Sequence, residues 1–220
     1  MIYRMPEERI KAMLLHQIDN FYFKTSSDEI ILDKYFDEIM ERVSKNFAKQ
    51  TNKYYSRCAV PGDETTRDTY FDPLHTCQWF IFLYYAANTI FKADKSAEAV
   101  ELCDKIYGVS KIISSADVFY QIDLPEFFAC DHPMGTVLGR AIYGNGFLFL
   151  QGCTVGNNHG KYPVIGENVH MYSDTKILGD CHIGNNVLIS ANTYIKDQDV
   201  PDDVIVFGKS PDLIFKKIHK

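Results

Sequence analysis

The chain has 220 residues, which is enough for one large domain or two small ones with a substantial core. Its hydrophobic share of 46% and charged share of 24% are ordinary for a globular soluble protein. The net charge of −6 argues against broad binding to nucleic acid or to anionic membranes, which requires basic patches, although a local basic site for one phosphorylated ligand is still allowed.

The sequence favours an intracellular, reduced protein. No secretory signal is visible at the N-terminus, and the most hydrophobic run, residues 79–87, is far too short to cross a bilayer. The six cysteines are scattered without a CxxC pair, so neither a zinc site nor a disulfide framework is indicated. We therefore expect a cytoplasmic protein that needs no metal and contacts no membrane.

Helical patterning extends over residues 1–127 and predicts an α-helical N-terminal domain. Ser26 and Glu29 have the spacing of a capping box. Apolar residues then follow at intervals of three and four up to Phe47, which is the pattern of an amphipathic helix. The first clear helix is thus predicted to begin at Ser26.

Two more helices are predicted further along this domain. Asp72 and Pro73 are suited to the N-cap and first turn of the second helix. The third begins near Ser96 and is expected to end at Gly108, because glycine is common just after a helix. Residues 49–72 are polar and broken by proline and glycine, so we predict a long connection there.

A strict six-residue repeat replaces the helical pattern in residues 128–220. Its repeating positions hold Ile165, Met171, Ile177, Ile183, Ile189 and Ile195. A smaller side chain stands four positions after each of the first five. A period of six fits neither a helix nor an ordinary strand, and it is the signature of a parallel β-helix in which three repeats form one coil.

The repeat contains one irregularity. Upstream it continues through bulky apolar residues at Val137, Tyr143, Phe149 and Val155. Ten residues rather than six then separate Val155 from Ile165. We expect the four additional residues to force residues 157–162 out of the coil as a loop, and this loop contains His159.

Several segments of this region resemble the serine acetyltransferases, a group within the hexapeptide acyltransferases. The resemblance covers roughly residues 128–215. It rests on a repeat region that begins Tyr-Pro-Val-Ile-Gly at 162, on Phe-Leu-Gln-Gly-Cys-Thr-Val-Gly at 149–156, on Asp-His-Pro-Met-Gly at 131–135 and on Val-Phe-Gly-Lys-Ser-Pro at 206–211. It implies that the β-helix is left-handed, against the usual rule for parallel crossovers.

The sequence departs from the family pattern in two places. The serine-specific members have a histidine immediately before the proline that aligns with Pro163, and this chain has Tyr162. They also carry a longer segment, with an Asp-His pair, between the positions that match Leu138 and Leu150. The resemblance is therefore stronger for the acyl donor than for the acceptor.

The resemblance implies a histidine general base that takes a proton from the acceptor, a task that suits an imidazole near neutral pH. We assign this role to His159, the alternative being a solvent-exposed loop histidine. Asp131 and His132 form a second catalytic candidate, because a carboxylate can fix the tautomer of an imidazole. Alternatively, His132 only shapes the turn into the first coil.

The resemblance also implies that coenzyme A lies in the groove between neighbouring β-helices of a homotrimer, and trimers could pair into a dimer of trimers. Ser190 and Ala191 occupy the stretch where the family has small residues. Gly208 and Lys209 would lie near the nucleotide, where the Lys209 ammonium offers a charge to a phosphate.

We therefore predict an acetyl-CoA-dependent O-acetyltransferase whose acceptor is the hydroxyl group of L-serine or of a sugar. The general base would activate that hydroxyl for direct attack on the thioester, without a metal or a covalent enzyme intermediate. Two alternatives stay open. One is an N-acetyltransferase that acts on an amino-sugar nucleotide, and the other is a non-catalytic β-helix subunit with a role in assembly.

Overall fold

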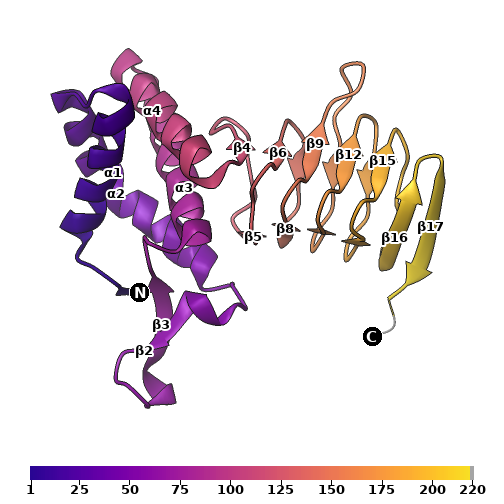
Figure 1. The fold of residues 1–220 in the computed structure, drawn as a ribbon, viewed down its shortest axis with the longest axis horizontal. Helices are drawn as coiled ribbons and strands as arrows, with labels where there is room; N and C mark the ends of the chain where they lie inside the picture. The colour runs from indigo at the N-terminus through magenta and orange to yellow at the C-terminus, as the bar shows by residue number, and fades with distance from the viewer. Residues whose placement is uncertain (219–220) are drawn as a thin grey trace. The chain divides into compact units, whose positions relative to one another are not determined.

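The computed structural model describes residues 1–218, so the last two residues of the predicted second domain lie outside it. The chain forms two compact units, Met1–Ser114 and Ser115–Lys220 (Figure 1). The sequence suggested a boundary between residues 127 and 128. The second unit begins earlier because β4 (Asp117–Val118) already pairs with β6 (Val137–Leu138), a strand of the β-helix.

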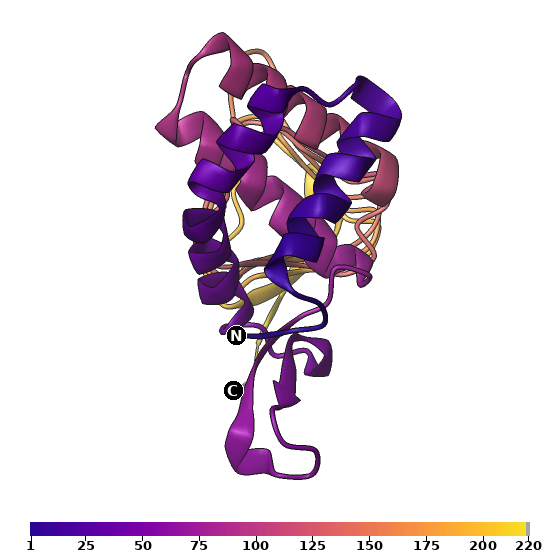
Figure 2. The same ribbon diagram turned by 90° about the vertical axis from the view of Figure 1, so that its left-hand side faces the viewer.

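Within the described residues, the first unit contains four α-helices. They are α1 (Glu7–Tyr22), α2 (Ser26–Phe47), α3 (Thr76–Ala93) and α4 (Ala97–Ser114). Figure 2 shows α1 and α2 side by side. The α3 helix is buried almost all round, since each residue of its stretch 77–90 is buried. No helix in residues 1–218 is both long and apolar enough to span a bilayer.

The predicted start of α2 at Ser26 is confirmed, but its predicted capping box was wrong, and so was the predicted start of α3. The capping box of α2 uses Thr25 and Asp28 instead of Ser26 and Glu29: the Asp28 amide donates to the Thr25 hydroxyl, and the Thr25 amide donates to the Asp28 carboxylate at 2.8 Å. The α3 helix begins at Thr76, three residues beyond Pro73. Its N-cap is His75, whose imidazole takes the place of the usual small oxygen acceptor.

The predicted end of the third helix was also wrong, because α4 continues past Gly108 to Ser114. The glycine has a packing role. A Cβ atom at position 108 would overlap the phenol group of Tyr22, so Gly108 makes room for the end of α1 against α4. The helix start near Ser96 is confirmed, since its hydroxyl accepts from the Ala99 amide.

The segment 49–72 was predicted to be a simple connection, but it folds. It contains the 3-10 turns η1 (Lys53–Tyr55) and η2 (Glu64–Thr66) and the strands β2 (Ser56–Cys58) and β3 (Arg67–Phe71). With β1 (Ile2–Tyr3), these strands make a small sheet in the order β1-β3-β2.

The second unit is a parallel β-solenoid with three faces, which we name A, B and C in the order in which the chain runs through them (Figure 1). Face A consists of β7 (Ile142–Tyr143), β10 (Val164–Ile165) and β13 (His182–Ile183). Face B consists of β5 (Phe128–Cys130), β8 (Phe147–Phe149), β11 (His170–Met171) and β14 (Leu188–Ile189). Face C consists of β4, β6, β9 (Thr154–Gly156), β12 (Lys176–Leu178) and β15 (Tyr194–Lys196).

The last two strands close the end of this solenoid. The long strand β16 (Val204–Lys209) pairs with β14 on face B and with β15 on face C, so it passes from one face to the next. It then forms an antiparallel hairpin with β17 (Asp212–Lys217).

The six-residue repeat is confirmed, since its repeating residues form the buried interior of the solenoid. All six aliphatic repeat residues from Ile165 to Ile195 are at most 3% exposed, and so are the smaller residues that follow them. Cys153 and Cys181 are fully buried among them. Each face thus sends its repeat residue inward while the neighbouring residues face outward.

The register between coils confirms the irregularity as well. On face A, Val164 pairs with His182, eighteen residues on, which is the length of three regular repeats. On face C, Thr154 pairs with Lys176, twenty-two residues on. The difference of four equals the irregularity in the sequence, so the additional residues leave the coil without shifting the strands that follow.

Candidate functional site

A tight loop leaves the coil between β9 and β10, at the corner where face C leads into face A (Figure 1). At its tip the Asn158 amide donates to the Lys161 carbonyl at 3.1 Å, and the Lys161 amide donates back at 3.0 Å. His159 and Gly160 between them have φ values of 50° and 78°. Positive φ at both central positions defines a type I′ turn, and it presents the exposed His159 side chain to solvent.

The stem of this loop is tied to the next two coils through one carboxylate. The Asn158 side-chain amide donates to Asp197, and the Asp180 backbone amide donates to the same carboxylate at 2.9 Å. The hydrogen bond from Asp180, followed by the one from Asn158, lowers the pKa of Asp197, and the charges of Lys196 and His159 act in the same direction. The anchor is therefore ionised at neutral pH.

A glycine makes room for this anchor. Gly179 has a φ of 81°, and a Cβ atom there would lie 2.7 Å from the Asn158 Cβ and overlap the Asp197 carboxylate. Lys161 adds an exposed ion pair to Asp180 at 3.8 Å, which contributes little by itself. The loop thus combines a fixed stem with an exposed imidazole at its tip.

Two shallow hollows lie on face C, and the smaller one borders the anchor of this loop. The larger has a volume of about 600 Å³, and its lining includes Lys176, Tyr194 and Lys209. The smaller, of about 360 Å³, is lined by Tyr194 and Lys196 and by Asp197, the anchor of the loop. Tyr194 borders both. The two linings together hold three lysines, Lys176, Lys196 and Lys209, and two carboxylates, Asp174 and Asp197, so this part of an acidic protein has a small excess of positive charge.

Of the residues predicted to bind the acyl donor, one lines a hollow on face C. Lys209 lines the larger one, as a site for a phosphate requires. Gly208 precedes it on β16. Ser190 and Ala191 lie at the corner between faces B and C, just before β15, and line neither hollow. The Ser190 amide donates to the Val206 carbonyl at 3.0 Å, which is part of the coil's own hydrogen bonding.

The second predicted catalytic pair lies at another corner. His132 follows β5, where face B leads into face C, whereas the His159 loop joins face C to face A. The His132 Nε2 atom is 3.7 Å from the Asp131 carboxylate, too long for a hydrogen bond. His132 has a φ of 49°, and its carbonyl accepts from the Met134 amide at 2.8 Å. This geometry is that of a turn-forming residue.

Sequence reasoning missed a better imidazole–carboxylate pair. The Nδ1 atom of His182 lies 3.2 Å from the Asp199 carboxylate, which also accepts from the His182 backbone amide at 2.8 Å. The two residues are seventeen apart, close to one coil, so the repeat stacks them. His182 is exposed on face A and pairs in register with Val164, near the loop.

The outward lysines and Tyr194 were also missed, although a signal for them exists. Lys176, Tyr194 and Lys196 are immediate neighbours of the buried repeat residues Ile177 and Ile195. Alternation along a strand therefore places all three on the outer surface of face C. His170, on face B, is partly buried, and this burial lowers its pKa.

Comparison with known proteins supports this description. A family model for the bacterial transferase hexapeptide (six repeats) matches residues 162–197. The chain is 33% identical to serine acetyltransferase of Synechococcus elongatus over 49% of its own length and 46% of that protein. It is 29% identical to serine acetyltransferase 2 of Arabidopsis thaliana over 60% of its length and 41% of that protein. The chain thus spans about half the length of these curated relatives.

Solved structures share the whole fold at lower identity. Serine acetyltransferase of Neisseria gonorrhoeae superposes with a TM-score of 0.71 and 17% identity, over 96% of this chain and 79% of that one. The Vibrio cholerae enzyme gives a TM-score of 0.70 and 18% identity, over 96% and 80%. A serine acetyltransferase in complex with CoA gives 0.62 and 19%, over 94% and 83%.

These likenesses confirm the predicted architecture, in which N-terminal helices precede a left-handed parallel β-helix. The repeat, the buried interior and the matching family model define a hexapeptide-repeat protein. Among such proteins, the chain resembles the serine acetyltransferases.

Proposed function

We propose that the protein is an acetyl-CoA-dependent O-acetyltransferase that acts on a small acceptor. The observation that carries this proposal is the type I′ turn that presents His159 at the edge of face C, where Asp197, the anchor of the loop, lines a hollow together with Lys196. A base at the end of a fixed stem, next to a surface suited to an anionic donor, is what direct acyl transfer requires. The likeness to named serine acetyltransferases supports the same reaction.

In this mechanism His159 acts as the general base. Acetyl-CoA supplies an activated acetyl thioester. The His159 imidazole accepts the proton of the acceptor hydroxyl while the hydroxyl oxygen attacks the thioester carbonyl. The carbon–sulfur bond then breaks, and the sulfur takes up a proton as coenzyme A leaves as a thiol. The acetyl group is transferred directly from the sulfur of coenzyme A to the oxygen of the acceptor, so no covalent enzyme intermediate forms.

The donor would bind on face C. Lys209 and Lys176, which line the larger hollow, would neutralise phosphate groups, and Gly208 precedes Lys209 on β16. Ser190 and Ala191 would contact the donor only if it extends around the corner between faces B and C. We also propose that the protein is a homotrimer in which the donor lies between adjacent β-helices. Light scattering coupled to size-exclusion chromatography tests this assembly.

The acceptor we propose is L-serine or the hydroxyl group of a sugar. The names of the curated relatives favour serine. The exposed Tyr162 beside the loop favours a different acceptor, because the serine-specific members have a histidine there. An aromatic ring at this position offers an apolar face against which a sugar can pack. An amine acceptor or a non-catalytic role would be revealed by the assay described next.

The test measures release of coenzyme A thiol from acetyl-CoA in the presence of serine, hexoses or amino-sugar nucleotides. With the accepted compound, we expect His159→Ala to lower kcat at least about 100-fold. His16→Ala is the matched control, because it removes another exposed histidine far along the chain. Full activity of His159→Ala would refute the mechanism. If His182→Ala is inactive in the same assay, the general base would be assigned to His182. Absence of acetyl-CoA binding in calorimetry would refute the enzyme itself.

A further inference from the structure

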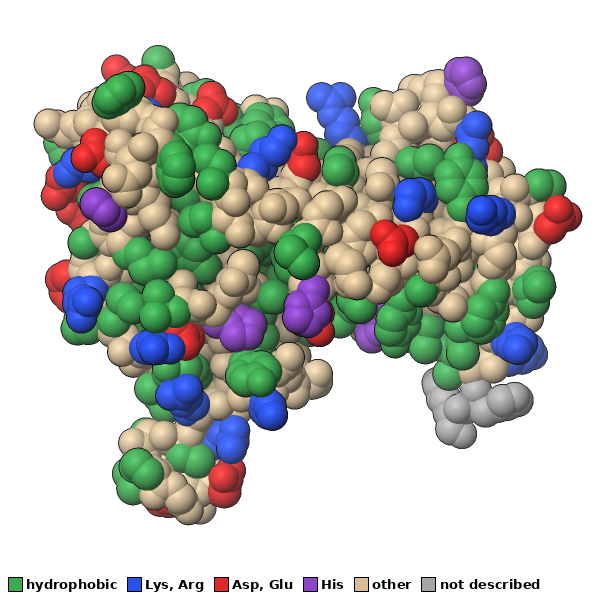
Figure 3. Space-filling view, in the orientation of Figure 1, with side chains coloured by type: hydrophobic (Ala, Val, Ile, Leu, Met, Phe, Trp, Pro, Cys, Tyr) green, Lys and Arg blue, Asp and Glu red, His purple; other side chains and the backbone are tan. Residues whose placement is uncertain are grey.

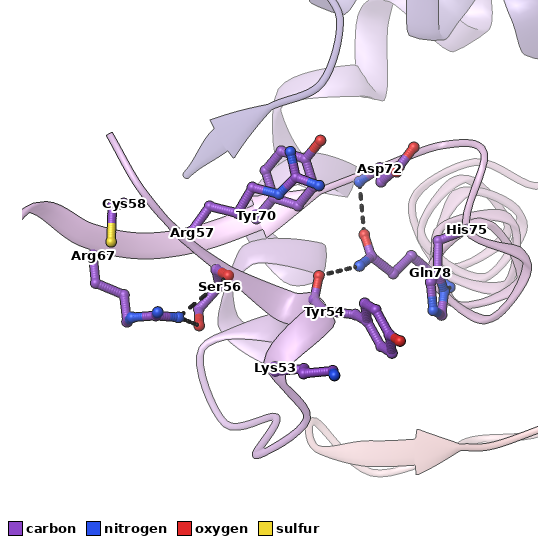
Figure 4. Close-up of a pocket in the computed structure, with 10 residues that line it drawn as sticks. All are labelled: Lys53, Tyr54, Ser56, Arg57, Cys58, Arg67, Tyr70, Asp72, His75 and Gln78. Carbon is purple, nitrogen blue, oxygen red and sulfur yellow. Dashed lines mark hydrogen bonds between the residues drawn. The ribbon is translucent and has the colours of Figure 1, made fainter. Parts of the chain in front are cut away.

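A separate hollow lies within the first unit, where η1 and β2 meet the start of α3 (Figure 4). Its volume is about 320 Å³, at the lower end of the range for small-molecule sites. Its lining combines basic and aromatic side chains, chiefly Lys53, Tyr54, Arg57, Arg67, Tyr70 and His75. All of these belong to residues 53–78, so the hollow is independent of the β-helix and of the function proposed for it.

The lining carries an excess of positive charge. Its one carboxylate, Asp72, is already paired with Arg4 at 2.7 Å, and Arg67 is paired with Glu64 at 2.8 Å. Lys53 and Arg57 have no carboxylate within ion-pair distance anywhere in the described chain. Figure 3 shows Lys and Arg side chains gathered over the β2–β3 hairpin, on a chain whose net charge is −6.

Aromatic rings hold these two free cations in place. The Arg57 guanidinium lies 4.0 Å from the centroid of the buried Tyr70 ring, and the Lys53 ammonium lies 5.3 Å from that of Tyr54. Stacking on a ring face leaves the N–H groups at the guanidinium edge available for an anion. A ring contact restricts the Arg57 side chain, so less of its conformational entropy is lost when a ligand binds.

The wall beside them is fixed by a buried amide. The Gln78 side chain is fully buried, donates to the Tyr54 carbonyl and accepts from the Asp72 amide, both at 2.7 Å (Figure 4). His75 Nδ1 accepts from the Gln78 amide at 3.4 Å, so in the neutral imidazole Nε2 carries the proton and is a donor. The Tyr54 and His75 rings lie 5.4 Å apart, centroid to centroid.

We propose that this hollow binds a small phosphorylated metabolite. Arg57 and Lys53 supply the charge-assisted hydrogen bonds that a phosphate group accepts, and His75 supplies a further donor. A metal ion is disfavoured, because the unpaired charges of the lining are positive. The Tyr54 and His75 rings provide apolar surface for the rest of the molecule. The full chain would thus carry a second ligand site, outside its β-helix.

The test is isothermal titration calorimetry of the full chain with inorganic phosphate, glucose 6-phosphate and adenosine monophosphate. We expect at least one of them to bind, and Arg57→Gln and Lys53→Gln each to weaken this binding by about tenfold or more. Both residues are exposed, so the variants should fold, and an unchanged melting temperature without ligand verifies this. Stronger binding of the nucleotide than of the sugar phosphate would identify a planar ligand.

Two controls separate this site from other surfaces. Arg9→Gln removes an exposed arginine of α1 outside the hollow, and Lys209→Gln removes the lysine proposed for the acyl donor. Neither should change the part of the binding that Arg57→Gln and Lys53→Gln weaken. The proposal is overturned if none of the three probes binds, if binding survives in the Arg57→Gln/Lys53→Gln double variant, or if Lys209→Gln alone abolishes it.

Discussion

Gly179→Ala should disable the loop that bears His159 without touching that loop directly. Gly179 has a φ of 81°, where an L-residue is strained by about 1–2 kcal/mol. The added methyl group would also overlap the Asp197 carboxylate and lie 2.7 Å from the Asn158 Cβ. Relieving such an overlap in packed surroundings costs a further roughly 1–3 kcal/mol. The total destabilisation is therefore about 2–5 kcal/mol, and the simplest relief is to displace Asn158.

Gly62→Ala is the matched control, because it separates backbone strain from the overlap. Gly62 has a similar φ of 85°, but a Cβ atom there meets nothing within 4 Å. Its cost should therefore be the strain alone, about 1–2 kcal/mol. Urea denaturation of both variants measures the difference, and the thiol-release assay measures its effect on the loop.

We expect Gly179→Ala to lose more stability than Gly62→Ala and, in addition, to lower kcat, because the stem that positions His159 has moved. Gly62→Ala should keep full activity. Equal losses of stability in the two variants would show that the overlap is absorbed elsewhere. Unchanged kcat in Gly179→Ala would show that the anchor through Asn158 and Asp197 does not position the catalytic loop.

Three further predictions concern groups that the folded chain holds in unusual surroundings. Lys105→Met should lower the free energy of unfolding by about 3 kcal/mol, because it leaves the buried Asp28 carboxylate without its partner at 3.0 Å; denaturation of Lys45→Met, an exposed pair, should show little change. Burial raises the pKa of Cys103 to about 12, so iodoacetamide at pH 8 should label the half-buried Cys58 and should not label Cys103 until the chain unfolds. Mass spectrometry of the labelled peptides measures this, and labelling of Cys103 in the folded state would contradict the prediction. Hydrogen bonds lower the pKa of Asp197 below its ordinary value of 3.8, so the anchor is complete above pH 3.8 and is lost as the pH falls through the lowered pKa. An NMR titration of the Asp180 amide should therefore have a midpoint below pH 3.8. A midpoint at or above pH 3.8 would show that these hydrogen bonds do not stabilise the ionised Asp197 carboxylate.

The β-helix was predictable because its code is local and redundant. Each six-residue repeat requires one bulky and one small interior side chain, as Ile177 and Cys181 show, and the same requirement recurs in successive repeats. The irregularity was equally readable, since the pairing of Thr154 with Lys176 has to absorb four additional residues somewhere. A solenoid whose neighbours contact only each other leaves few other places for them.

The helix ends were less predictable because tertiary contacts decide them. Gly108 looks like a helix terminator in the sequence, yet it lies within α4 because the Tyr22 ring needs the space that a side chain would fill. At the start of α3, Asp72 does act as a local acceptor, for the Leu74 amide, while the Gln78 side chain ties its backbone amide and so delays the helix to Thr76. Local cap preferences were right in kind and wrong in position.

The candidate site likewise contains some features that the sequence predicts and others that depend on tertiary structure. The loop and its histidine follow from counting residues, and they were found. The anchor at Asp197, the His182–Asp199 pair and the two hollows on face C depend on which residues of successive coils stack, which requires the register of the coils as well as their period. Once that register is known, residues seventeen or eighteen apart become neighbours, so the sequence can be reread for stacked pairs. His182 and Asp199 form one of these pairs, and for this reason His182→Ala should be assayed together with His159→Ala.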